Sequence, residues 1–125
     1  MLRFTNLERV VLAAICDAQE GTAEPLRALL ATAQMRQREN TGHGFFTYFE
    51  VDQTHGSVAT QSNPLYGLEL SVKVGGQVLL MGFLIWFTGG YPDCLEGFQY
   101  STEAGENIDL KAEDLFALVP LGPMK

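Results

Sequence analysis

Glu96 is the residue whose surroundings most suggest a binding role, because an acid stands there between the apolar Leu95 and Gly97. A carboxylate in a half-buried strand has to be solvated or paired, since burying a bare charge is costly. Strand alternation puts it on one face with three further residues: Cys94, Phe98 and Tyr100. A ligand pocket around Glu96 would draw on the aromatic rings of Tyr100 and Trp86. The alternatives are an ion pair with a nearby arginine and an exposed place on the sheet.

Arg36 and Arg38 are the second candidate for binding. They alternate with Gln37 and Glu39, so both guanidinium groups would lie on one side of an extended segment. Two arginines on one face can hold a carboxylate or a phosphate through paired hydrogen bonds. The alternative is a charged edge strand that discourages aggregation between sheets.

No metal, cofactor or catalytic residue is predicted. The only histidines, His43 and His55, have no third histidine or cysteine at a ligand-like spacing. Cys94 lies between Asp93 and Glu96, and negative neighbours raise the pKa of a thiol, which works against a nucleophile. We therefore expect Cys94 to be a small buried residue. The sequence also lacks a Gly-x-Gly-x-x-Gly, a P-loop and a Gly-x-Ser-x-Gly motif.

The composition indicates one folded, acidic domain. The 125 residues are 46% hydrophobic and 18% charged, which suits a single core for the whole of 1–125. The net charge is −7, which argues against nucleic-acid binding through phosphates. Between Asp93 and Asp114 there are seven acids and one base, Lys111. Such a stretch is either a solubilising surface or an acidic face for a basic protein partner.

Neither a membrane span nor an export signal is expected. The longest apolar run, 78–87, is too short for a helix that crosses a bilayer, which needs about 20 residues. Charged residues interrupt the N-terminal residues 1–9, and no small-residue cleavage site follows a long apolar run there, unlike in a signal peptide. Two cysteines, Cys16 and Cys94, make no disulfide framework, so we expect free thiols in the cytoplasm.

The first positioning element should be a helix over about residues 6–20. Thr5 and Glu8 match a capping box, and apolar residues at helical spacing follow. Cys16 lies about 180° from that apolar stripe, so it should face outward and react faster than Cys94 with a thiol reagent.

A second helix follows, with its apolar stripe at Leu26, Leu29, Leu30 and Ala33. Residues 34–39 either continue that helix or form a strand. The turn-rich residues 40–44 resemble a hairpin connection and favour a strand near 35–40.

From Gly44 the apolar period changes to two, which predicts strands separated by short turns. They are expected at 45–52, 68–74, 78–87, 94–100 and 115–121. Short turns force antiparallel neighbours, so the fold class is α+β: two N-terminal helices packed on an antiparallel sheet of five or six strands. The strand 78–87 is apolar on both faces and should be central. If one of those faces is exposed, it should be a partner or dimer surface.

Three segments resemble a pattern found in a family of small uncharacterised bacterial proteins. They are Met81-Gly82-Phe83-Leu84-Ile85-Trp86-Phe87 with Gly89-Gly90-Tyr91, then Cys94-Leu95-Glu96-Gly97-Phe98-Gln99-Tyr100, and the turn and strand at 39–47. Ser101-Thr102-Glu103 stands where the pattern has glycine, acids and Trp-Pro. The resemblance implies a small soluble α+β domain and no catalytic residue.

Two functional hypotheses follow. The first is a non-enzymatic protein-interaction domain that binds a protein partner or a second copy of the chain. Small acidic immunity proteins are an analogy, based on size, charge and fold class alone. The second is a small-molecule-binding domain, either a binding protein or an enzyme, with a pocket between sheet and helices around Glu96 and an arginine. The lack of an acid–base or nucleophile set favours the first.

Overall fold

The computed structural model of the chain describes residues 4–19, 21–41, 44–58, 63–74, 77–99 and 118–123. For Asn6, Asn40, His55, parts of β3 and β4 and all of β6, it describes the backbone alone. Its elements are α1 (Asn6–Asp17), α2 (Ala23–Ala31), β1 (Gln34–Asn40), β2 (Gly44–Glu50), a short 3-10 helix η1 (Gln53–His55), β3 (Leu65–Val74), β4 (Gln77–Thr88), β5 (Tyr91–Gln99) and β6 (Leu118–Pro123). Both helices precede the strands, in agreement with the α+β prediction.

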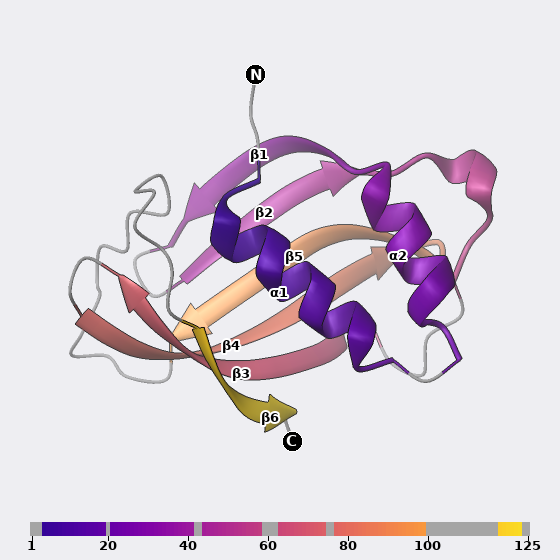
Figure 1. The fold of residues 1–125 in the computed structure, drawn as a ribbon. Helices are drawn as coiled ribbons and strands as arrows, with labels where there is room; N and C mark the ends of the chain where they lie inside the picture. Colours follow the sequence, from indigo (N-terminus) through magenta and orange to yellow (C-terminus); the bar gives the residue numbers. More distant parts are fainter. Residues whose placement is uncertain are drawn as a thin grey trace.

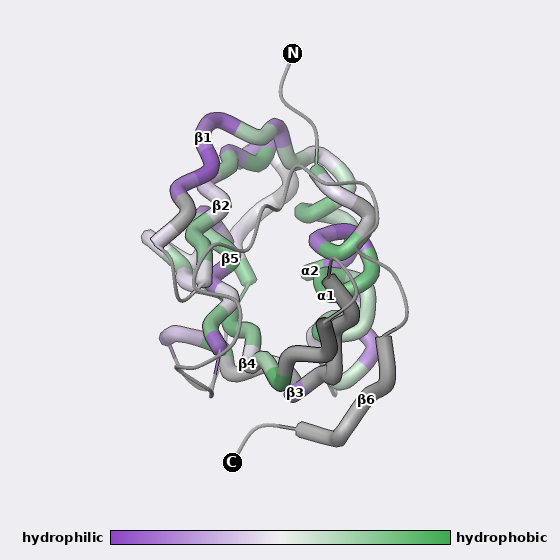
Figure 2. The backbone as a smooth tube through the Cα atoms, turned by 90° about the vertical axis from the view of Figure 1, so that its left-hand side faces the viewer, coloured by the Kyte–Doolittle hydropathy of each residue, from purple (hydrophilic) through white to green (hydrophobic). Residues whose placement is uncertain are grey.

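All the strand pairs are antiparallel, and the sheet has the order β1-β2-β5-β4-β3-β6. The two helices lie together on one face of this curved sheet (Figure 1). The side view in Figure 2 separates the layers, with α1 and α2 opposite β1, β2, β5 and β4. The strand predicted at 78–87 is β4, and it lies inside the sheet between β5 and β3, as expected.

The prediction of two helices packed on five or six strands needs a correction. Among the side chains that the structure describes, the core cluster draws on the two helices and only four strands: Phe45 and Phe49 of β2, Leu65 of β3, Met81, Phe83, Ile85 and Phe87 of β4, and Leu95 of β5. The strands β1 and β6 are the edges of the sheet. Of these two, β1 has described side chains, and its one buried hydrophobic residue, Met35, lies outside the core cluster because an edge strand has a strand neighbour on one side alone.

Helix α1 begins as the sequence predicts. The Thr5 hydroxyl accepts from the Glu8 amide at 3.1 Å, and the Glu8 carboxylate accepts from the Thr5 amide at 2.6 Å. The helix ends earlier than expected, at Asp17, and Gly21 has a positive φ of 78° in the connection to α2.

Cys16 is buried, so the prediction that it faces outward is wrong. The side of α1 away from the sheet is exposed at Val10 and Ala13, and Cys16 instead belongs to the core cluster together with Leu26 of α2. Helix α2 lies beside α1 on the same face of the sheet and is joined to it by an Arg27–Asp17 ion pair of 2.5 Å. Periodicity identified the stripe on the sheet side but could not show the second helix beside α1. Both cysteines are free, as expected.

The ambiguous segment 34–39 is a strand. Helix α2 stops at Ala31, and β1 pairs with β2 through a hairpin in which the Thr41 amide donates to the Gly44 carbonyl at 3.0 Å. Near its start β1 carries a bulge at Arg36, because Met35 and Gln37 pair with the adjacent residues Phe49 and Tyr48. An extra residue in one strand reverses the alternation of side chains across it.

At the end of the chain, the strand predicted at 115–121 is found as β6 at Leu118–Pro123, paired with β3. Residues 115–117 lie outside the described part. In the described residues no helix is long and apolar enough to cross a membrane.

Candidate functional site

The face of the sheet opposite the helices carries the predicted acid Glu96, and we call it the outer face. Side chains alternate along each strand, so residues between the core positions point to this face. Cross-strand pairing then gives two rows on β2, β5 and β4: Tyr48–Cys94–Trp86 and Phe46–Glu96–Leu84. Phe98 and Leu80 extend the outer face along β5 and β4.

The outer face exposes apolar side chains. Tyr48 is 37% exposed, Trp86 38% and Leu80 40%. These three are among four exposed large hydrophobic residues of the described chain, and the fourth, Val10, lies on α1. The rings of Phe46 and Tyr48 stack at a centroid distance of 6.1 Å. Leu84 and Cys94, which occupy outer-face positions, are buried, although neither belongs to the core cluster between sheet and helices.

Glu96 is half-buried in the middle of this surface. Its Oε1 accepts a hydrogen bond of 2.9 Å from Trp86 Nε1, so the structure brings together two of the residues predicted to bind. Among the described side chains, the arginines form their ion pairs with other acids. The expected sharing of a face with Cys94 and Phe98 is confirmed, whereas Tyr100 lies outside the described residues.

The neighbouring Gly97 explains the Leu-Glu-Gly-aromatic pattern. Leu95 and Gly97 point to the core while Glu96 and Phe98 point outward. A Cβ on Gly97 would lie 2.4 Å from Phe45 Cε1 and 2.9 Å from Phe83 Cε1. Glycine at this position therefore lets two phenyl rings fill the core directly behind the glutamate.

Further acids surround the outer face. Glu39 pairs across strands with Phe46, next to Glu96, and Asp93 lies on a bulge of β5, where it accepts from the Thr88 hydroxyl. Desolvation raises the pKa of the Tyr48 hydroxyl, and the nearby Cys94, Glu39 and Glu96 raise it further. Among the described side chains, the acids next to Tyr48 are thus Glu39 and Glu96.

Cys94 has the properties of a buried structural thiol. Its pKa rises from 9.0 to about 12, first through desolvation and then through the charges of Asp93 and Glu96. Cys16 is also raised, to about 11, chiefly by desolvation. Neither thiol is poised as a nucleophile, because the thiolate is the reactive form.

The structure separates the two candidate arginines. Arg36 is the bulge residue and forms a 2.6 Å ion pair with the exposed Glu50 at the sheet margin. Arg38 points the other way, into the protein, where its Nε and Nη2 donate to Glu8 at 3.0 and 2.5 Å. The prediction that both guanidinium groups share one side is wrong, because the bulge reverses the alternation between them.

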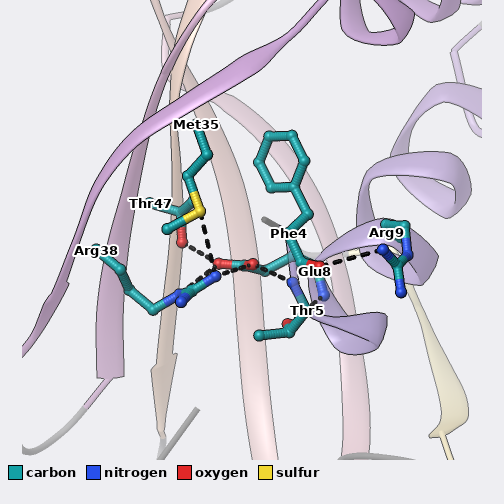
Figure 3. Close-up of polar contacts among 7 residues, drawn as sticks. All are labelled: Phe4, Thr5, Glu8, Arg9, Met35, Arg38 and Thr47. Atoms are coloured by element: carbon teal, nitrogen blue, oxygen red, sulfur yellow. Dashed lines mark hydrogen bonds and ion pairs between the residues drawn. The ribbon is translucent and has the colours of Figure 1, made fainter. Parts of the chain in front are cut away.

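The internal ion pair of Glu8 and Arg38 was not foreseen. Figure 3 shows the Glu8 carboxylate between the Arg38 guanidinium, the Thr47 hydroxyl and the Thr5 amide, all of which donate to it. Glu8 is 0% exposed. One signal was present: Glu8 falls at helical spacing with Val11 and Ile15, on the buried side of α1. Its carboxylate is saturated by these donors, which indicates a structural role rather than a ligand site.

An open depression of about 350 Å³ lies where β2 and β4 end and β5 begins. Its lining consists of Phe49, Glu50, Val51, Gln53, Thr88, Tyr91, Pro92 and Asp93. Glu96 is absent from that lining, and it points away from the helices, so the depression is not the pocket between sheet and helices that the sequence suggested.

No metal centre is apparent within the described ranges, where no three His, Cys, Asp or Glu side chains gather to hold an ion. His43 and the side chain of His55 lie outside the described part. Comparison with known proteins gave no match to a family model, to a curated protein or to a solved structure.

Proposed function

We propose that the chain is a non-enzymatic protein-interaction domain that binds its partner with the outer face of the sheet. The observation that carries the proposal is the gathering of Tyr48, Leu80 and Trp86 on one surface, each more than a third exposed. Tryptophan and tyrosine are the residue types that most often dominate binding energy at protein interfaces. Trp86 and Tyr48 share one cross-strand row, Leu80 lies further along β4, and the half-buried rings of Phe46 and Phe98 lie in the rows between them. A large apolar patch on a protein surface commonly marks an interaction site.

The competing small-molecule hypothesis required Glu96 and an arginine around a pocket between sheet and helices. Glu96 lies on the face of the sheet opposite the helices, and the Arg38 guanidinium is ion-paired with Glu8 inside the protein. An immunity-like role is one member of the interaction class, and a cytoplasmic location agrees with the two free thiols.

The proposal is tested by selecting peptides from a random display library on the immobilised protein. We expect selected clones to lose at least about tenfold in affinity for a Leu80→Ser, Trp86→Ser variant, because the apolar anchors of an interface carry most of its energy. Val10→Ser is the matched control, since Val10 is 42% exposed and lies on α1, and it should leave binding unchanged. Clones that bind all variants equally, or a selection that yields no clone above background, would refute the proposal.

A further inference from the structure

We infer that the partner segment bound by the outer face is cationic, with arginine or lysine side chains between apolar ones. This inference rests on the proposed function and adds the chemistry of the occupant. It depends on three features of the described residues: the charge balance of the outer face, the geometry of its rings and carboxylates, and the acidic depression at one end.

The charge balance is strongly one-sided. Five acidic residues lie on or beside the outer face against two basic ones, an excess of three negative charges among the residues whose backbone is described there; the acids are Glu39, Glu50, Glu69, Asp93 and Glu96, and the bases are Arg36 and Lys73, the latter placed by its backbone register opposite Val78. The helical layer is closer to balance, with Arg9 and Arg27 among its acids. Opposite charges on two binding surfaces speed their association and discriminate against partners of like charge. The negative outer face therefore favours a partner with a basic binding surface.

The rings and carboxylates are interleaved in a way that suits a guanidinium. On the neighbouring strands Glu96 pairs with Phe46 of β2 and Leu84 of β4, and its carboxylate accepts a hydrogen bond from the Trp86 indole. Its carboxylate has acceptor capacity beyond the single indole donor, because an ionised carboxylate offers about four acceptor sites. A planar cation can stack on an aromatic ring and still donate to a neighbouring carboxylate.

A second copy of the chain fits this surface poorly. A two-fold dimer would place the same patch against itself, so the acids of one copy, Glu39 and Glu96 among them, would be brought close to the acids of the other. Like charges brought together in an interface cost affinity. The apolar residues alone would allow self-pairing, but the acids among them argue for a partner of opposite charge.

The depression continues the acidic surface beyond the rings. Glu50 and Asp93 are its charged lining residues, and the Gln53 carbonyl beside it accepts from the Tyr91 hydroxyl at 3.1 Å. Thr88 and Asp93 join it to the end of the outer face. A long basic side chain of a segment that crosses the sheet can reach this hollow.

Three synthetic peptides provide the test. They share the same leucine and valine residues and differ in the alternating positions, which are arginine, serine or glutamate. Trp86 is the only tryptophan of the chain, and its indole lies on the outer face, so its emission reports binding there directly. We expect the arginine peptide to bind at least about tenfold more tightly than the serine peptide, the glutamate peptide not to bind, and the affinity for arginine to weaken as ionic strength rises.

Variants localise the effect. Glu39→Gln with Glu96→Gln should weaken binding of the arginine peptide by about fivefold or more, because it removes the two acids nearest to the rings. Glu24→Gln removes the same kind of charge from exposed α2 and should change nothing.

The outcomes separate the inference from the proposed function. Equal binding of the arginine and serine peptides, lost in Leu80→Ser, would keep the docking face and overturn its preference for cations. A concentration-dependent dimer in which Trp86 is shielded from solvent would show that a second copy of the chain occupies the outer face, and would overturn the inference. Binding of the arginine peptide that ignores Leu80→Ser and responds equally to Glu24→Gln would be unspecific attraction to an acidic protein and would overturn both. Failure of all three peptides would count against both as well.

Discussion

Removal of the Arg38 guanidinium should destabilise the fold far more than removal of Arg36, although the two residues stand in the same strand and both are ion-paired. Arg38 is 12% exposed and Glu8 0%, whereas the side chains of Arg36 and Glu50 are 54% and 68% exposed. In Arg38→Met the aliphatic stem remains, but Glu8 loses two charge-assisted hydrogen bonds and keeps only Thr47 and the Thr5 amide.

Breaking one side of a buried pair typically costs about 3–5 kcal/mol, because the other charge stays buried and uncompensated. An exposed pair contributes about 0–1 kcal/mol, which is the expectation for Arg36→Met. With a urea m-value of about 2 kcal/mol/M, Arg38→Met should lower the unfolding midpoint by about 2 M, and Arg36→Met by less than about 0.5 M.

The assay is urea unfolding followed by far-UV circular dichroism, with Glu8→Met, Arg38→Met as a third variant. Replacing both partners leaves no unpaired charge, so the double variant should regain most of the lost stability. Equal small losses in the two single variants would refute the account of the Glu8–Arg38 pair, and so would a double variant no more stable than Arg38→Met.

Three further outcomes are expected. Gly97→Ala should destabilise the chain by about 1–3 kcal/mol in the same urea assay, because a Cβ meets two phenyl rings; an unchanged midpoint would contradict the packing. Burial holds the pKa of Cys16 at about 11 and that of Cys94 at about 12 in the folded state, above 9.0, so their contribution to stability is complete below about pH 9 and is lost as pH rises through those values. The free energy of unfolding should fall by up to about 1.4 kcal/mol per pH unit for each thiol above pH 9, and a Cys16→Ala, Cys94→Ala variant with an equally steep fall would contradict this. Caesium ions should quench Trp86 fluorescence more strongly than iodide ions, each measured against the neutral quencher acrylamide, because a negative surface attracts cations and repels anions. The difference should shrink in Glu96→Gln, and stronger quenching by iodide would show that the outer face is not negative.

Local patterns predicted local structure well. The capping box at Thr5 and Glu8 begins α1, and the change of period at Gly44 begins β2. The uninterrupted apolar run near 78–87 correctly predicted an interior strand. Each of these features depends on neighbours within a few residues in the chain, which the sequence shows directly.

The errors arose where distant elements meet. Cys16 is buried in the core that α1 shares with α2, and Glu8 is hydrogen-bonded to Arg38 across 30 positions of the chain; neither arrangement leaves a periodic signal. The bulge at Arg36 shifted the face of everything after it in β1, which alternation alone cannot reveal. Alternation grouped Glu96 with its neighbours correctly but could not say which side of the sheet the helices would cover.

The claim that the outer face of the sheet is the binding surface is tested most directly by following the amide chemical shifts of the protein by NMR during titration with the arginine peptide. We expect shift changes at outer-face positions of the three central strands, Tyr48, Glu96 and Trp86, with the single indole N–H among the largest because it lies on that face. Leu12 of α1 and Leu26 of α2, both buried on the other side of the sheet, should not move. Changes centred on the helices, with the Trp86 indole signal unmoved at saturation, would contradict the claim.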